Sequence, residues 1–206
     1  MERAIETEDD KALVYMVFPT ADGLDTERRR SLSFLAEVLQ DRLRVKVREE
    51  LGAAYSPGAS ASSSETFPGI GLITISASMP PEEAQTFADA SLALARELME
   101  KGVTAEELAR LAEPMLARIR DAQRTNGYWA RALAEAQSRP STLEDTRSLE
   151  AFYRALDPER LSALAKESLA AEKASLLVVM PAEATPAPVE AATPGEAGTG
   201  KKEDQR

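Results

Sequence analysis

The order of apolar segments along this 206-residue chain predicts an α+β fold, in which a mixed or antiparallel sheet is covered by helices in a two-layer sandwich. Strand-like and helical patterns follow one another as strand, helix, two strands, a run of helices and a final strand. The second and third strand-like segments lie close enough in the sequence to form an antiparallel hairpin. The helices between this hairpin and the last strand would then supply the second layer.

The first strand and the helix after it have distinct patterns. Residues 12–19 (ALVYMVFP) are almost all apolar and rich in strand formers, which is typical of a central strand covered on both faces.

A long helix is expected next, from about residue 27 to residue 50, and Asp25 or Thr26 can cap its start. Gly52 is a natural left-handed stop after that helix. Apolar residues recur along it at spacings of three and four, namely Leu32, Leu35, Leu39, Leu43 and Val47.

The next two segments predict the hairpin. Residues 53–64 are mostly Ala, Ser and Gly, so we expect an extended strand whose backbone another molecule can approach closely. Residues 65–69 predict a turn, and residues 70–79 alternate as a strand. The glycines Gly69 and Gly71 are too isolated for a phosphate-binding loop and are expected to serve turn geometry.

The remainder of the folded region is predicted to be mainly helical. Thr104-Ala105-Glu106-Glu107 has the form of a capping box, and Pro114 is expected to kink the helix that follows. Asp157-Pro158 predicts another helix start. The expected helices are 82–101, 105–125, a segment from about 126, 142–156 and 158–171, before a buried strand at 174–180.

These elements divide the chain into three regions. Residues 1–11 are polar and acidic and are expected to be a linker or disordered lead-in. Residues 12–180 should form a single α+β domain. Residues 181–206 are rich in Pro, Ala, Glu and Gly, which predicts a disordered tail.

Composition excludes several classes of function. The formal net charge of −10 argues against nucleic-acid binding, which needs a basic surface. The chain has no cysteine and no histidine, which excludes cysteine nucleophiles and removes the commonest general base and zinc ligand. No apolar run approaches the roughly 18 residues of a membrane span. The start, Met1-Glu2-Arg3, lacks the apolar core of a signal peptide.

Two donor side chains flank the turn between the long helix and the second strand. Arg48 ends the helix and Tyr55 follows seven residues later, so the two can converge on one point. Spacing alone favours a simpler interpretation, in which Arg48 is a surface arginine stabilised by the helix dipole and Tyr55 is a half-buried strand aromatic. Glu49 and Glu50 are adjacent and lack a metal partner, so neither is expected to act as a general base.

Two further clusters have simple structural interpretations. The serines Ser60, Ser62, Ser63 and Ser64 have no histidine to activate a nucleophile, and we expect them on a small-residue strand facing a substrate cleft. Tyr128-Trp129 is expected to anchor the core of the helical layer rather than to form a ligand platform.

Three stretches together resemble a known family. Residues 11–19 (KALVYMVFP), the Arg48-x6-Tyr55 pair within REELGAAYS, and the helix start Asn126-Gly127-Tyr128-Trp129 are similar to the insulinase/pitrilysin zinc peptidases, which carry an inverted H-x-x-E-H motif. The similarity covers roughly residues 11 to 180. It corresponds to the last α+β unit, in the C-terminal half, of the bacterial members.

The resemblance implies a function that depends on another domain. In that family the N-terminal half carries zinc and the catalytic glutamate, and an Arg and a Tyr of the C-terminal half bind the substrate backbone and help stabilise the oxyanion. Arg48 and Tyr55 occupy those positions by resemblance, as accessory catalytic residues. With no histidine, no cofactor or metal is expected on this chain, and zinc is expected on the partner N-terminal half. The chain alone should be inactive.

The resemblance leaves alternatives open. The partners it implies are a zinc-bearing half or subunit and a peptide or protein substrate, in a proteolytic metalloendopeptidase. The alternative is a non-catalytic structural or assembly subunit of the same fold, and a third possibility is a stand-alone binding module. Bacterial relatives suggest a periplasmic or membrane-associated location through a precursor.

Overall fold

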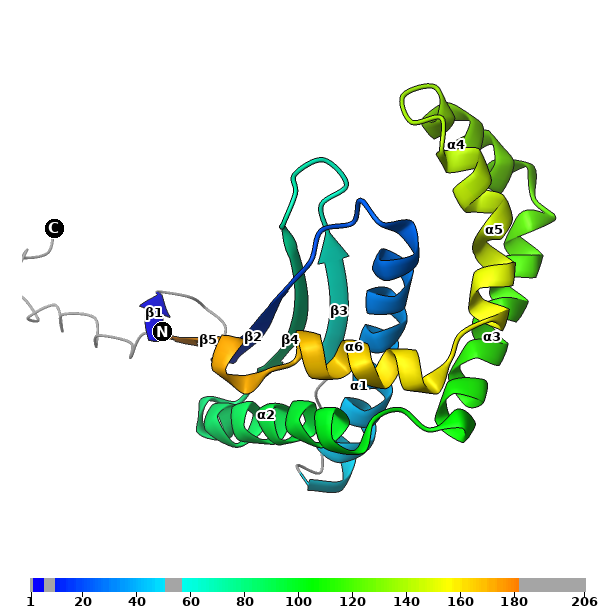
Figure 1. Cartoon of the computed structure of the whole chain (residues 1–206). Coiled ribbons are helices and arrows are strands. Elements are labelled where there is room, and N and C mark those ends of the chain that lie inside the picture. The colour runs from blue at the N-terminus through cyan, green and yellow to red at the C-terminus, as the bar shows by residue number, and fades with distance from the viewer. Residues whose placement is uncertain (1, 6–9, 51–56, 182–206) are drawn as a thin grey trace, which may run out of the picture.

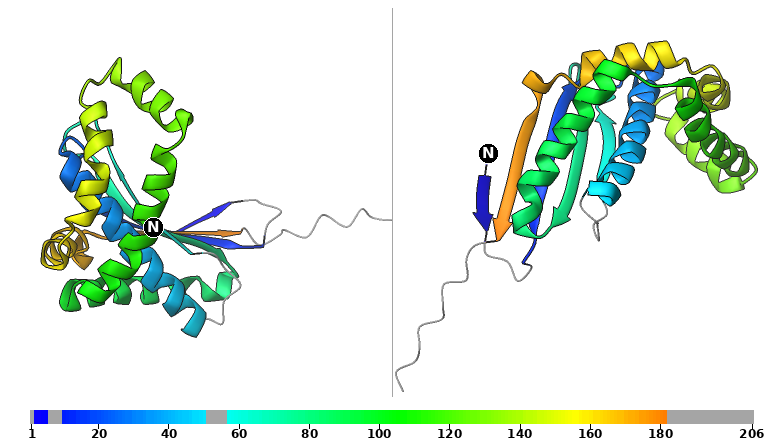
Figure 2. Two further views of the ribbon diagram at one scale, coloured as in Figure 1. Left: turned by 90° about the vertical axis from the view of Figure 1, so that its right-hand side faces the viewer. Right: turned by 90° about the horizontal axis from the view of Figure 1, so that it is seen from below.

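The computed structural model describes residues 2–5, 10–50 and 57–181 (Figure 1). It contains one five-stranded sheet whose strand order is β1-β5-β2-β4-β3. Helices gather on one side of this sheet, and three of them extend outward as an arm (Figures 1 and 2). The architecture confirms the predicted α+β fold, with a sheet and a helical layer.

The sheet is antiparallel except at one edge. The central strand β2 (Ala12–Thr20) pairs antiparallel with β4 (Gly71–Met79) on one side and with β5 (Ser175–Pro181) on the other. Strand β3 (Gly58–Ser63) pairs antiparallel with β4, which confirms the predicted hairpin. Strand β1 (Glu2–Ile5) pairs parallel with β5 at the other edge. Residues 2–5 therefore form a strand within the stretch predicted as a lead-in, held by backbone pairing that their polar composition does not reveal.

The helices begin and end close to the predicted positions. Predicted caps are present: Asp25 Oδ1 accepts from the Glu27 and Arg28 amides, and Thr104 Oγ1 accepts from the Glu107 amide at 3.1 Å. The α-helices are α1 (Thr26–Glu50), α2 (Ala84–Lys101), α3 (Ala105–Gln123), α4 (Asn126–Ala136), α5 (Thr142–Arg154) and α6 (Pro158–Ser168), with short 3₁₀ helices η1 (Pro81–Glu83) and η2 (Ala171–Lys173). None of the helices in the described part of the chain is long and apolar enough to cross a bilayer.

One face of the sheet forms the core with α1, α2 and α6. On β2, Val14, Met16 and Phe18 are at most 2% exposed, and Ile73 and Ile75 of β4 are fully buried beside them. The predicted helical stripe packs against this face. It consists of Leu32, Leu35, Leu39, Leu43 and Val47, all at most 2% exposed. Burial of this size is the main stabilising contribution to the domain.

The opposite face of the sheet is open. Leu13 and Tyr15 on β2 are each 39% exposed, and Leu177 on β5 is 37% exposed. Their register places them side by side, because Tyr15 pairs with Leu177 and Leu13 with Val179. The prediction that both faces of β2 are covered is therefore wrong for the residues that the structure describes. An all-apolar strand indicates two apolar faces, and here no described element lies over the second one.

Two glycines of the hairpin region support its geometry. Gly69 has φ of 74°, as a turn glycine should. Gly71 begins β4, and a Cβ there would overlap the carbonyl of Ala21. Both observations agree with the predicted structural role of these residues.

Candidate functional site

The predicted pair lies at the end of α1 and in the segment that follows it. Arg48 belongs to the last turn of α1, but its side chain, like those of Glu49 and Glu50, lies outside what the structure describes. Tyr55 falls in residues 51–56, which are also outside the described ranges. The pairing of Arg48 with Tyr55 therefore stays a prediction. The residues on either side of them define where this site would form.

The C-terminal half of α1 is anchored to the α2–α3 connection by Arg42. Its Nε and Nη2 atoms donate to the two carboxylate oxygens of Glu107 at 2.8 and 2.7 Å, and Nη2 also donates to the Gly102 carbonyl at 2.7 Å. The two side chains are only 18% and 12% exposed. The hydrogen bonds that Arg42 donates to Glu107 raise the pKa of Arg42. This paired geometry fixes α1 six residues before Arg48.

A second ion-pair group lies one residue earlier on α1. Asp41 accepts from Arg110 Nη2 at 2.6 Å and from Arg44 Nη2 at 3.1 Å, and its side chain is 9% exposed. The hydrogen bond from Arg110 holds the pKa of Asp41 below its ordinary value, so this carboxylate stays ionised. Together these contacts tie α1 to α3 on the side away from the sheet.

Edge strand β3 is attached to the same part of α1. The Gln40 side chain donates from Nε2 to the Pro57 carbonyl at 2.9 Å and accepts from the Ala59 amide at 2.5 Å. Gln40 thereby holds the start of β3 against α1, about 12 Å along the helix from Arg48 at 1.5 Å per residue. Pro57, which directly follows the segment that contains Tyr55, is thus held against the middle of α1.

Strand β3 contributes a small, hydroxyl-bearing surface. Ser60 and Ser62 are exposed and lie in register with Thr74 and Leu72 on the open face of the sheet. Ser64 instead accepts hydrogen bonds from the Thr66 and Phe67 amides in the hairpin turn. The serine cluster therefore divides into a sheet surface and a turn. Neither part includes a base that could activate a hydroxyl, because the chain has no histidine.

The aromatic pair Tyr128 and Trp129 is not in the core, contrary to prediction. Trp129 is 36% exposed and donates from Nε1 to the Gln123 carbonyl at 2.7 Å. The two rings pack edge to face with their centroids 5.4 Å apart. Both lie on α4, at the far end of the arm formed by α3, α4 and α5 (Figure 1). The far end of the arm extends away from the sheet, so Tyr128 and Trp129 have no core to enter there.

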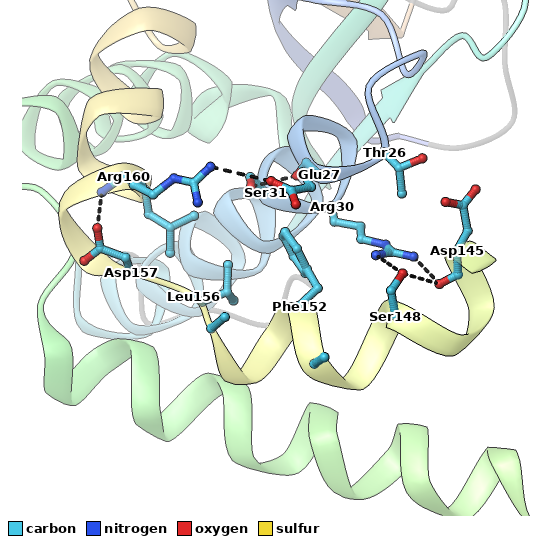
Figure 3. A pocket seen from close by; sticks show the side chains of 13 residues that line it. Thr26, Glu27, Arg30, Ser31, Asp145, Ser148, Phe152, Leu156, Asp157 and Arg160 are labelled. Atoms are coloured by element: carbon cyan, nitrogen blue, oxygen red, sulfur yellow. Dashed lines mark hydrogen bonds and ion pairs between the residues drawn. The ribbon is translucent and has the colours of Figure 1, made fainter. Parts of the chain in front are cut away.

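A hollow of about 380 Å³ lies between the first turns of α1 and helices α5 and α6 (Figure 3). Arg160 pairs with Glu27 at 3.7 Å, and Asp157 accepts hydrogen bonds from the first amides of α6. The Ser31 hydroxyl donates to the Glu27 carbonyl. These polar groups are satisfied by one another, so the hollow is a seam between packed helices.

The residues of this chain do not fit a zinc site. The sequence has no histidine and no cysteine, and the described residues contain no group of three or more metal-binding side chains. Oxygen ligands alone are atypical of zinc, which favours nitrogen and sulfur.

Comparisons with known proteins place this fold in context. The chain is 28% identical over 188 residues to the chloroplastic stromal processing peptidase of Pisum sativum, covering 84% of this chain and 15% of that protein. The periplasmic protease PqqL from Escherichia coli is 16% identical, with a TM-score of 0.70 over 88% of this chain and 21% of PqqL. An inactive peptidase domain from Bordetella parapertussis has the same TM-score at 16% identity and covers 87% of this chain and 95% of its own.

The chain thus spans a small part of the peptidase and protease named first, and nearly all of the single domain named last. The two likenesses to solved structures concern the fold alone. The family model described as the peptidase M16 inactive domain matches residues 2–115, which include the sheet strands β1 to β4 with α1 and α2. Because this match covers more than half of the sequence, the chain belongs to the peptidase M16 inactive-domain family.

Proposed function

We propose that this chain is the substrate-binding, non-catalytic domain of a zinc metalloendopeptidase. In this proposal Arg48 and Tyr55 hold the backbone of a bound peptide and help stabilise the oxyanion formed at a zinc site on another domain. Arginine offers a rigid fork of donors to a carbonyl, and a phenol offers a neutral donor to a developing oxyanion. Membership of an inactive-domain family supports a role without its own metal.

The observation that carries the proposal is the attachment of β3 to α1 by Gln40. Because Gln40 binds both the Pro57 carbonyl and the Ala59 amide, the chain returns to α1 directly after the segment with Tyr55. Arg42 and Glu107 hold the same half of α1 from the other side. Preorganised donors of this kind are effective because little reorganisation is needed when charge develops.

The open face of the sheet is the surface that we assign to the zinc-bearing half. Leu13, Tyr15 and Leu177 form an apolar stripe, and serines and threonines of β3 and β4 lie beside it. An apolar stripe with a polar border is typical of an interface between domains. Since the chain spans 15% of the stromal processing peptidase and 21% of PqqL, we assign the zinc-bearing half to the same parent chain or to a partner subunit. The periplasm, where PqqL is found, is the location that we propose.

The test combines this chain with a zinc-bearing M16 half and measures cleavage of a fluorogenic peptide. We expect no cleavage by this chain alone and cleavage by the mixture. Arg48→Ala and Tyr55→Phe should each lower kcat by roughly ten- to a thousandfold, the range for losing one oxyanion donor. Arg44→Ala is the matched control, because Arg44 lies one turn earlier on α1 and is 60% exposed.

The outcomes separate this function from its alternative. If both variants cleave as fast as the wild type, Arg48 and Tyr55 do not contact the reacting peptide. If the mixture assembles but remains inactive with every peptide, the result favours the alternative, a structural or assembly subunit of the same fold. Assembly is measured independently by analytical ultracentrifugation, so the two readouts do not depend on each other.

A further inference from the structure

A second cavity, of about 570 Å³, lies between the first turns of α1 and the inner side of the arm formed by α3, α4 and α5. Four guanidinium groups and two carboxylates line it. The arginines are Arg29, Arg30, Arg131 and Arg139, and the acids are Glu135 and Asp145. A concentration of arginine is unexpected on a chain whose net charge is −10. The cavity therefore has a local charge opposite in sign to that of the whole chain.

Arg30 is the buried member of this set. It is 8% exposed, and its guanidinium donates to Ser148 Oγ at 3.2 Å and to the Asp145 main-chain carbonyl. It also lies over the Phe152 ring, 5.5 Å from its centroid, and Figure 3 shows it in the lining of the first hollow. Arg30 lines both hollows. No carboxylate among the described residues forms an ion pair with it. Burial lowers the pKa of Arg30, and the nearby Asp145 carboxylate acts in the opposite direction. The hydrogen-bond partners of Arg30 are neutral, and an added anion stabilises a buried cation of this kind.

The other three arginines are incompletely neutralised. Arg29 and Arg139 share a single carboxylate, that of Glu65 in the hairpin turn. Arg139 has only a distant second carboxylate, that of Glu135 at 4.0 Å, and its Nε donates to the Thr142 hydroxyl at 3.0 Å. Arg131 is exposed on α4 and forms no hydrogen bond or ion pair with any residue that the structure describes. Its donors are available to a ligand.

The start of α4 adds further donors to the cavity. Thr125 caps this helix by accepting from the Tyr128 amide, and Gly127 lies in the cavity wall. The first amides of a helix have no partner within the helix and carry partial positive charge. A Cβ added at Gly127 would meet nothing within 4 Å, so this part of the cavity is open.

We propose that this cavity binds the carboxylate of an acidic peptide, supplied either by an Asp or Glu side chain or by a chain terminus. Arginine forks bind carboxylates through two parallel hydrogen bonds. The cavity is larger than one carboxylate, and Tyr128 and Leu149 line it beside the charged groups, which suits the rest of a peptide. The exposed Trp129 and Leu133 continue this apolar character along α4.

This site is separate from the one proposed at Arg48. Arg30 and Arg48 are eighteen residues apart on one helix, which corresponds to about 27 Å at 1.5 Å per residue. The arginine-lined cavity would therefore bind a part of the peptide that lies away from the reacting bond. The inference goes beyond the proposed function and does not depend on it, because it is tested by binding to this chain alone.

The test is isothermal titration of the whole chain with three short peptides. The first is glutamate-rich with both ends blocked, the second is its glutamine counterpart with both ends blocked, and the third is that counterpart with a free terminal carboxylate. We expect binding of the first, the third or both, and no binding of the second. Binding of the first assigns the site to acidic side chains, and binding of the third assigns it to chain termini.

Variants at exposed positions test the residues. Arg131→Gln should weaken binding by about tenfold, the range for one charge-assisted hydrogen bond. Arg118→Gln is the matched control, because Arg118 is exposed on α3 outside the cavity lining. This substitution changes the net charge by the same amount as Arg131→Gln. It should bind as the wild type does.

Gly127→Glu tests the cavity without damaging the fold. It places a competing carboxylate in the open space, so it should abolish binding, whereas Gly127→Gln should retain it. Both variants should raise the melting temperature, because glycine is a poor helix former and φ at Gly127 is not positive. Equal binding of the blocked glutamate and glutamine peptides, or no binding of either acidic peptide, would overturn the proposal. So would unchanged binding by both Arg131→Gln and Gly127→Glu.

Discussion

Replacing Glu107 by glutamine should weaken the attachment of the C-terminal half of α1 to α3, while Arg110 still binds Asp41. The amide keeps the size of the side chain but can accept only one of the two hydrogen bonds from Arg42, which lie at 2.8 and 2.7 Å. Arg42 is then left as an 18% exposed cation that keeps the Gly102 carbonyl as partner. Loss of a charge partner in such a partly buried site costs about 2 kcal/mol of unfolding free energy.

The assay is urea unfolding followed by circular dichroism. With a slope of about 2 kcal/mol per molar urea, the midpoint should fall by about 1 M. Glu150→Gln is the control, because Glu150 pairs with Arg154 on the surface of α5. Glu150→Gln should lower the free energy of unfolding by less than about 0.5 kcal/mol, as is general for exposed ion pairs.

A double variant separates the pair from its surroundings. Arg42→Met with Glu107→Leu removes both charges, so no unpaired cation remains, and it should regain most of the lost stability. If Glu107→Gln unfolds within about 0.5 kcal/mol of the wild type, the pair does not anchor α1. The C-terminal half of α1 would then not depend on Arg42 and Glu107 for its position.

Three further predictions concern individual positions. Ser91→Ala should stabilise the domain by about 1 kcal/mol in the same urea assay, because the buried Ser91 hydroxyl has no partner within the described residues. Gly102→Ala should lower the melting temperature, since φ is 71° there and a Cβ would overlap the Ser162 side chain. The hydrogen bond from Arg110 lowers the folded-state pKa of Asp41 below its usual 3.8, so its stabilisation is complete above that pH and is lost as pH falls through the folded pKa. The destabilisation caused by Asp41→Asn, measured by urea unfolding, should therefore be large at about pH 7 and shrink towards about pH 2.

The sequence predicted the elements that local patterns define. The stripe from Leu32 to Val47 determines which side of α1 packs on the sheet, and Thr104 and Asp157 mark helix starts through their own side chains. These signals need no knowledge of distant residues. The α+β class followed from their order along the chain.

The missed features depend on pairing between distant segments. Strand β1 exists because residues 2–5 meet β5 from the other end of the chain, and their composition carries no strand pattern. The open face of β2 was predicted as covered, because apolar residues such as Leu13 and Tyr15 are expected inside when only the sequence is considered. Both differences concern what lies next to a strand, which local periodicity cannot specify.

The candidate sites illustrate the same division. Arg48 and Tyr55 are close in the sequence, so their association could be inferred from spacing and resemblance. The arginine-lined cavity joins Arg30 of α1 to Arg131 of α4 and to Arg139 in the connection between α4 and α5. A signal was available in the sequence, since arginines are frequent in 28–30 and 118–139 of an otherwise acidic chain. Only the fold shows that α4 and the start of α1 face a common space.

Helix α1 connects the two proposed sites, and different interactions hold its two ends. Arg30 binds Ser148 and the Asp145 carbonyl at the first turns, whereas Arg42 binds Glu107 near the last. A rigid helix would transmit a displacement from one of its ends to the other. Glu107→Gln, however, weakens only the contact of Arg42 and leaves the contacts of Arg30 in place. Glu107→Gln should therefore lower peptide cleavage by the mixture with a zinc-bearing half while leaving binding of the acidic peptide to the cavity unchanged. A parallel loss of both activities would mean that the arm and the end of α1 move as one unit, and that the two sites are coupled.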